Sequence, residues 1–172
     1  MSPNVAIEIE RKYIIKMPDL DSILMIDGST KSSILQIYLP SKKGETHRIR
    51  RREYDDKTVC TETKKIRIDN MSAEEIEREI SPLEFGALAL DIMEGTTPID
   101  KVRYTFSYKD QLFEIDVYPA WQNTAIMETE LDSRITNVEI PGFIEIIREV
   151  TGDKAYSNAA MSKSFPVEDR WN

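Results

Sequence analysis

Charged side chains recur at every second position along several short segments of this sequence. The first is IEIERKY, residues 7–13, in which Glu8, Glu10 and Lys12 alternate with other residue types. Because successive side chains of a β-strand point to opposite faces, a strand here would carry two carboxylates and an ammonium on one face. A solvated strand face has the same pattern, so this segment alone does not distinguish an outward from an inward orientation.

The same alternation returns, with the signs separated, in further segments. Residues 48–52 and 101–103 carry basic side chains at alternate positions, whereas 114–116 and 128–130 carry acidic ones and 75–79 carries three glutamates. Exposed rows of opposite sign would stabilise one another only weakly. We therefore interpret the rows as one inward-facing surface, with the apolar positions covered from outside by amphipathic helices.

A cavity lined in this way suits a complex of a metal ion with a polyphosphate. Arginine forks match pairs of phosphate oxygens, and clustered carboxylates suit a divalent cation that bridges those oxygens. The chain has one histidine, His47, and one cysteine, Cys60, so neither a histidine cluster nor a cysteine-rich zinc site can form. Carboxylate ligands favour hard cations, namely Mg²⁺, Mn²⁺ or Ca²⁺.

Period-two patterning also predicts the elements that must position these residues. We predict eight strands, over residues 5–16, 34–40, 46–54, 57–66, 72–80, 98–108, 111–119 and 124–132. Three helices are expected, over 17–26, 81–93 and 140–152; in the second, Ser81 is the N-cap and Pro82 follows it. This pattern favours an α+β, mainly antiparallel β fold: a closed eight-stranded β-barrel with a charged interior and helices outside.

Length and composition limit the remaining classes. A chain of 172 residues with 40% hydrophobic and 31% charged residues fits a single domain, 1–172, with a real core. The net charge of −8 disfavours a nucleic-acid partner, despite the basic run HRIRRR at 47–52. There is no run of eighteen apolar residues and no signal-peptide pattern, so we expect a cytoplasmic protein without a membrane partner.

Taken in order, these motifs resemble the CYTH superfamily, the triphosphate tunnel metalloenzymes. EIERKY is similar to the E-x-E-x-K signature of that family. The similarity continues through RIR (48–50), EIERE (75–79), KVR (101–103), FEIDVY (113–118), METEL (127–131) and REVTGDKAYSN (148–158). The resemblance implies an eight-stranded barrel whose tunnel binds triphosphate compounds with Mg²⁺ or Mn²⁺. Members include inorganic triphosphatases, thiamine-triphosphatases, class IV adenylate cyclases and RNA triphosphatases.

The resemblance also assigns roles to the charged rows. The implied metal ligands are Glu8, Glu10, Glu128 and Glu130. The implied triphosphate-binding residues are Lys12, Arg48, Arg50, Lys64, Lys101 and Arg103. Further interior carboxylates are Glu77, Glu79 and Asp116, and the residues taken as catalytic are Glu8, Glu10, Lys12, Arg48 and Arg50.

Two positions depart from the family pattern. At CTETKKI (60–66) the family shows T-x-K, so Lys64 and Lys65 compete for the interior, and we favour Lys64. Arg51 and Arg52 are additional basic residues, of which at least one must point outward.

The reaction we favour is metal-dependent hydrolysis of a triphosphate, with inorganic tripolyphosphate or a small organic triphosphate as the substrate. Positioning and charge neutralisation supply most of what phosphoryl transfer requires. The alternatives are a class IV-type adenylate cyclase, a thiamine-triphosphatase and a non-catalytic module that binds polyphosphate or nucleotides. The expected partner is a small-molecule triphosphate, and a homodimer is an open alternative.

Several residues in the last third of the chain have either a structural or a functional interpretation. Trp121 and Trp171 could stack on adenine or could simply pack. Tyr156 and Asn158 could order the final segment or close one tunnel mouth, and Lys163 could reach a phosphate.

Overall fold

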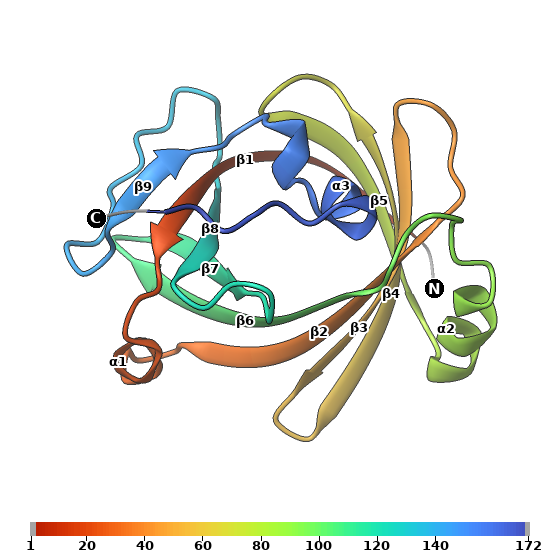
Figure 1. The fold of residues 1–172 in the computed structure, drawn as a ribbon, viewed down its shortest axis with the longest axis horizontal. Helices are drawn as coiled ribbons and strands as arrows, with labels where there is room; N and C mark the ends of the chain where they lie inside the picture. The colour runs from red at the N-terminus through yellow and green to blue at the C-terminus, as the bar shows by residue number, and fades with distance from the viewer. Residues whose placement is uncertain (1–2, 171–172) are drawn as a thin grey trace.

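Nine strands and a few short helices form the fold in the computed structural model, which describes residues 3–170 (Figure 1). The strands are β1 (Asn4–Lys16), β2 (Thr30–Leu39), β3 (Glu45–Tyr54), β4 (Lys57–Arg67), β5 (Ser72–Ile80), β6 (Ile99–Tyr108), β7 (Gln111–Val117), β8 (Thr124–Glu130) and β9 (Ile146–Glu149). The helices are α1 (Leu20–Leu24), α2 (Pro82–Ala89) and α3 (Asn158–Lys163), with a 3-10 turn, η1 (Lys154–Tyr156). None of the helices within residues 3–170 is long and apolar enough to cross a membrane.

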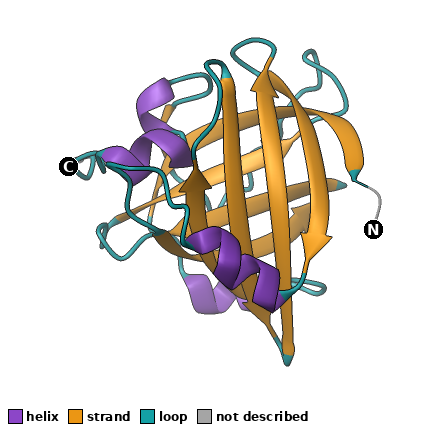
Figure 2. Ribbon diagram, turned by 90° about the vertical axis from the view of Figure 1, so that its right-hand side faces the viewer, coloured by secondary structure: helices purple, strands orange, loops and turns teal. Residues whose placement is uncertain are grey.

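The first eight strands close into an antiparallel barrel. Their order is β5-β4-β3-β2-β6-β7-β8-β1, and β1 pairs with β5 to complete the ring. Strand β1 makes this closure possible because residues 4–9 pair with β5, whereas residues 10–16 pair with β8. Figure 2 shows the strands curving around a common interior with helices against the sheet. The predicted eight-stranded barrel is confirmed.

The apolar sides of the strands form two clusters beneath helices. Ile23 of α1 packs in a cluster with Tyr13 and Phe106 of the sheet. Phe85 of α2 packs with Ile37 and Ile49 in another cluster. Since burial of apolar area is the main stabilising contribution to a fold, these outer clusters hold the barrel together and leave the charged alternate positions for the interior.

Two of the three predicted helices are present, in shorter form. Helix α1 lies within the predicted 17–26, and α2 lies within 81–93. The predicted cap of α2 is confirmed, because the backbone N–H of Glu84 donates to Ser81 Oγ at 3.0 Å. That bond satisfies one of the N–H groups that lack a partner in the first turn of a helix.

The prediction of a helix over 140–152 is wrong, because residues 146–149 form strand β9, which pairs with β1. Ile146 packs against the cluster beneath α1, whereas its neighbour Ile147 packs against a different cluster. Adjacent apolar residues on opposite sides are the pattern of a strand, not of a helix. Gly142 near the beginning of the segment also disfavours a helix.

Helix α3 was not predicted from the sequence, and it packs against the end of the barrel interior. Met161 of α3 lies in a buried cluster with Ile14, Tyr38, Tyr118 and other apolar residues. These strand residues share the inward parity of the charged rows. One end of the interior is therefore apolar, and the charged region begins beside it.

Candidate active site

The charged part of the interior contains a cavity of about 780 Å³. Eight of the predicted site residues line it: Glu8, Glu10, Lys12, Arg48, Arg50, Arg103, Glu128 and Glu130. The structure thus brings together side chains from four strands, β1, β3, β6 and β8. Their chemical roles remain predictions, but their shared position is a property of the fold.

Strand register explains why these side chains face one another. Glu10 lies opposite Glu130 and Lys12 lies opposite Glu128 in the antiparallel pair of β1 and β8. Directly opposite residues place their side chains on the same face of a sheet. Lys12 accordingly forms an ion pair with Glu128, with Nζ and Oε1 at 3.2 Å.

Lys65, and not Lys64, faces the cavity, so our preference for Lys64 is wrong. In the pairing of β3 with β4, Arg48 lies opposite Thr63, which places Thr63 and Lys65 on the inward parity. Lys64 is exposed on the other face. Lys65 Nζ lies 3.1 Å from Glu8 Oε1. The T-x-K spacing that the family resemblance implied is therefore present in Thr63 and Lys65.

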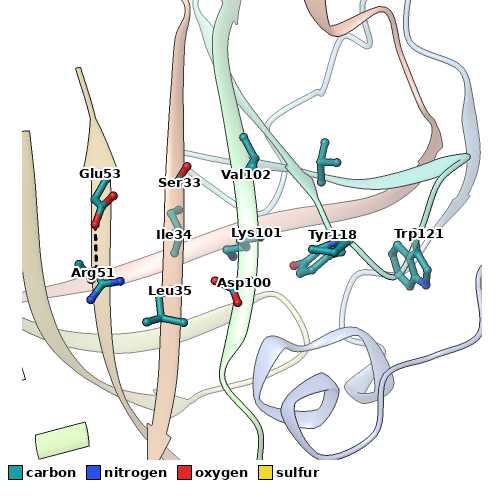
Figure 3. Close-up of a pocket in the computed structure, with 12 residues that line it drawn as sticks. Ser33, Ile34, Leu35, Arg51, Glu53, Asp100, Lys101, Val102, Tyr118 and Trp121 are labelled. Carbon is teal, nitrogen blue, oxygen red and sulfur yellow. Dashed lines mark ion pairs between the residues drawn. The ribbon is translucent and has the colours of Figure 1, made fainter. Parts of the chain in front are cut away.

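The two additional arginines lie on opposite faces of β3. Arg51 points outward, where its Nε lies 3.2 Å from Glu53 Oε1, and this pair lines a separate outer cavity of about 460 Å³ (Figure 3). Arg52 has the inward parity of Arg50, but its Nε donates to Ser32 Oγ at 2.9 Å. The expectation that at least one of the two points outward is confirmed.

Lys101 does not reach the cavity wall, contrary to its predicted contact with the triphosphate. Its side chain is 0% exposed, and its Nζ lies 2.8 Å from Asp116 Oδ2. Burial lowers the pKa of Lys101 to about 7, although Asp116 opposes that shift. Arg103 forms an ion pair with the same carboxylate, with Nε and Oδ1 at 2.7 Å, and a second one with Glu114 Oε2 at 2.8 Å. Asp116 is therefore shared by Lys101 and Arg103 and orients the Arg103 guanidinium.

The remaining predicted carboxylates lie away from the cavity wall. Glu77 faces the interior and accepts a hydrogen bond from Thr63 Oγ1 at 2.9 Å. Glu79 has the same parity on β5 but is exposed near the end of that strand. By contrast, Glu75 and Glu114 line the cavity and were absent from the predicted site. Both belong to rows visible in the sequence, but the family motif gave no reason to select them.

Two arginines of the wall retain unused hydrogen-bonding capacity. Arg50 makes no ion pair within residues 3–170; its Nε and Nη2 donate to the neutral Gln36 Oε1 at 3.1 and 2.8 Å. Burial, together with the neighbouring Arg48 and Arg103, lowers the pKa of Arg50 to about 9. Arg48 Nε is buried without a hydrogen-bond partner in the described chain. Buried donors and cations of this kind indicate a site for an anion.

The opposite part of the wall is crowded with carboxylates. Glu10 and Glu130 form no ion pair within the described residues. Burial and the nearby Glu128 raise the pKa of Glu10 to about 8, and burial and the nearby Glu8 raise the pKa of Glu130 to about 7. Burial also raises the pKa of Glu8, with Glu75 adding to the shift. Such crowding suits a cation.

The donor set fits Mg²⁺ or Mn²⁺, because every candidate ligand is a carboxylate oxygen. In the chain from residue 3 to residue 170, however, no group of three or more His, Cys, Asp and Glu side chains is arranged to hold a metal ion. Mg²⁺ commonly uses one or two carboxylates and completes its shell with water and substrate phosphates. Glu10 and Glu130 are the two that lack a cation partner, so they fit that role best.

The C-terminal residues have mainly structural positions. Trp121 is 3% exposed, packs against Tyr118, and donates from Nε1 to the carbonyl of Pro166 at 3.0 Å. Asn158 Oδ1 accepts a hydrogen bond from Tyr118 Oη at 2.8 Å. Lys12 Nζ donates to the carbonyl of Tyr156 at 3.2 Å, which joins η1 to the cavity wall. Lys163 lines the cavity, and Trp171 lies outside the described residues.

Solved structures with the same arrangement of strands include the inorganic triphosphatase NE1496. It superposes with a TM-score of 0.58 at 27% sequence identity, covering 92% of this chain and 96% of that chain. The chain has the tunnel fold of the CYTH superfamily. No protein-family model matches the sequence, and no curated protein matches it either.

Solved structures with lower sequence identity share the fold. The PH1819 protein from Pyrococcus horikoshii OT3 has a TM-score of 0.56 at 22% identity, covering 74% of this chain and 80% of that chain. HpAC1 from Hippeastrum, which has a dominant triphosphatase activity, has a TM-score of 0.50 at 17% identity, covering 73% of this chain and 80% of that chain. At this level of identity the similarity concerns the fold alone.

Proposed function

We propose that this protein is a metal-dependent hydrolase of triphosphate compounds, with inorganic tripolyphosphate as the preferred substrate. The observation that carries the proposal is the contrast within one cavity between an unpaired buried cation and unpaired carboxylates. Arg50 has no anionic partner in the described chain, while Glu10 and Glu130 have no cationic one. A metal–triphosphate complex supplies both missing partners.

The cations of the wall would bind and orient the phosphate chain. Arg48, Arg50 and Arg103 have inward-facing guanidinium groups on neighbouring sides of the cavity, and guanidinium forks pair with phosphate oxygens. Lys12 and Lys65, each beside a glutamate, would exchange that partner for a phosphate oxygen. Phosphoryl transfer depends mainly on holding the phosphate chain of the substrate in line for attack and on stabilising the charge on its equatorial oxygens.

Glu10 and Glu130 would hold the metal, with Glu8 and Glu128 beside them. When bound, Mg²⁺ or Mn²⁺ neutralises phosphate charge and lowers the pKa of a coordinated water.

The cavity wall favours an inorganic chain over a nucleotide. Among the described residues that line it, Tyr38 is the only Phe, Tyr or Trp, and it is only 4% exposed. Trp121, one of the two candidates for stacking on adenine, packs against Tyr118; the other, Trp171, lies outside the described residues. The inorganic triphosphatase activity named for NE1496 supports the same substrate.

The test is phosphate release from tripolyphosphate, thiamine triphosphate and ATP, with Mg²⁺, Mn²⁺ or excess chelator. We expect turnover of tripolyphosphate that requires the metal and that is lost in Arg50→Ala protein purified in parallel. Cyclic AMP and pyrophosphate from ATP would instead indicate a cyclase. Tight binding of tripolyphosphate without turnover in any metal would indicate a non-catalytic binding module.

A further inference from the structure

Gln36 is a buried polar side chain in the centre of β2, where the sequence offered no reason to assign it a role. It lies between the apolar residues Leu35 and Ile37 and is 0% exposed. In the pairing of β2 with β3 it lies directly opposite Arg50. Its side chain therefore has the inward parity, and it lies alongside the guanidinium of Arg50.

The contacts of Gln36 fix both the orientation of its amide and the direction of Arg50. Gln36 Oε1 accepts hydrogen bonds from Arg50 Nε and Nη2, and Gln36 Nε2 donates to Tyr38 Oη at 3.2 Å. Because the amide nitrogen is engaged by Tyr38, the carbonyl oxygen is the atom presented to Arg50. Two of the five guanidinium N–H groups are used in this way, and the remaining three stay available to a ligand.

The neutral character of this contact distinguishes Arg50 from the other cations of the wall. Lys12 and Lys65 each contact a glutamate. Arg103 contacts both Asp116 and Glu114. Among these four residues, Arg50 alone has no carboxylate partner in the described chain, so its positive charge is not cancelled there.

We propose that Gln36 is a positioning residue that holds Arg50 in place without neutralising it, and that this makes Arg50 the main electrostatic anchor for a phosphate group of the substrate. The inference rests on the proposed function and specifies how one residue of that site is prepared. A glutamate at position 36 would preserve the two hydrogen bonds from Arg50 but would cancel its charge. The neutrality of the Gln36 amide therefore matters to the site as well as its shape, because it leaves the positive charge of Arg50 uncancelled.

The test compares Gln36→Glu with Gln111→Glu by titrating tripolyphosphate calorimetrically in chelator, where no metal-dependent turnover occurs. Gln111 contacts the carbonyl of Asn137 and the N–H of Glu139 and is not among the residues that line the cavity. Gln111→Glu therefore makes the same change in net charge outside the cavity. We expect Gln36→Glu to weaken tripolyphosphate binding at least about tenfold, which corresponds to losing one charge-assisted hydrogen bond. Its melting temperature should stay equal or rise, because a carboxylate beside Arg50 compensates a buried cation.

A purely structural role for Gln36 predicts a different result. In that case Gln36→Glu would lower the melting temperature, or would leave binding equal to that of Gln111→Glu, and either outcome would overturn the inference. If Gln36→Glu fails to fold, Gln36→Met keeps the length of the side chain and removes the acceptor for Arg50 together with the donor to Tyr38. Unchanged binding by that variant would also overturn the inference. If the parental protein binds no tripolyphosphate in chelator, Mg²⁺ or Mn²⁺, the proposed function itself fails.

Discussion

Glu10 and Glu130 lie directly opposite one another across β1 and β8, on the face that lines the cavity. Neither makes an ion pair within residues 3–170, and each has a raised pKa, about 8 for Glu10 and about 7 for Glu130, mainly because of burial. The protein therefore keeps two acids that resist ionisation at the place where a metal is expected. This relationship leads to the first two predictions.

The metal-free protein should lose stability with rising pH through the titration of Glu10. A carboxyl whose pKa rises from 4.5 to about 8 on folding binds a proton in the folded state that the unfolded chain has lost. Its stabilising contribution is therefore complete below pH 4.5 and disappears as pH rises towards 8. Comparing Glu10→Gln with the parental protein isolates this contribution. The difference in melting temperature between them should grow from pH 5 to pH 8 in favour of the variant.

A difference in melting temperature that does not change with pH would contradict that prediction and would indicate that Glu10 has an ordinary solvated environment. Lys101 contributes in the opposite direction, because its lowered pKa makes the free energy of unfolding rise with pH above about 7. Taking the difference between the two proteins cancels that contribution.

Binding of Mn²⁺ should be stronger at alkaline pH. The metal requires ionised carboxylates, and Glu10 and Glu130 are largely protonated below pH 7. We expect a larger rise in melting temperature with Mn²⁺ at pH 8.5 than at pH 6, accompanied by proton release in an unbuffered titration. The Glu10→Gln variant should lose most of the effect, and an equal shift at both pH values would argue against these ligands.

Arg50→Ala and Arg51→Ala should differ sharply, although the two residues are adjacent. Arg50 lines the cavity, whereas Arg51 points outward beside Glu53. We expect Arg50→Ala to weaken tripolyphosphate binding by at least about tenfold, through loss of a charge-assisted contact. Arg51→Ala should change it by less than about twofold, because it alters an exposed ion pair with Glu53 and a contact with Phe85, both outside the cavity. Similar losses in both variants, measured by titration, would show that strand β3 is bulged at this point.

The neighbouring lysines of β4 provide a second matched pair. Lys65 contacts Glu8 at the cavity wall, and Lys64 is exposed on the other face. Steady-state kinetics should show a raised KM for tripolyphosphate in Lys65→Ala and parental values in Lys64→Ala. The reverse result would restore the assignment that the sequence favoured and would contradict the register of β3 with β4.

Asp116→Asn should be the most destabilising substitution of the interior. It leaves Lys101 and Arg103, both buried beside it, without their shared carboxylate. Breaking a buried ion pair from one side costs about 3–5 kcal/mol of unfolding free energy. Chemical denaturation measures this loss, and the conservative variant Asp116→Glu serves as the control that keeps the charge.

The fold was predictable from the sequence because strand parity is a strict rule. Period-two alternation located all eight barrel strands, and the signs of the charged rows indicated which parity lines the interior. The segment 140–152 misled the prediction because its isoleucines suit a helix by spacing, and only the free edge of β1 beside it decides for a strand.

Within the site, the alternation in the sequence identified the rows of charged residues but not how deeply each side chain is buried. Lys101 has the same parity as Arg103, yet it is buried beneath the wall by its pairing with Asp116. The choice between Lys64 and Lys65 depended on which residue of β4 lies opposite Arg48. The register between two strands cannot be deduced from the sequence of either strand alone. Gln36 gave no signal, because a single amide in an apolar strand acquires its role only from the residue across the sheet.

The apolar clusters beneath α1 and α2 lie outside the ring, so much of the packing that maintains the barrel is remote from the charged cavity wall. Many enzymes build the binding site over their main core, so a change in specificity disturbs the packing that keeps them folded. Here, a substitution at the cavity wall removes little of the outer packing. This architecture allows the wall to exchange acids, bases and neutral groups over evolutionary time, and so to acquire new substrates, while the scaffold persists.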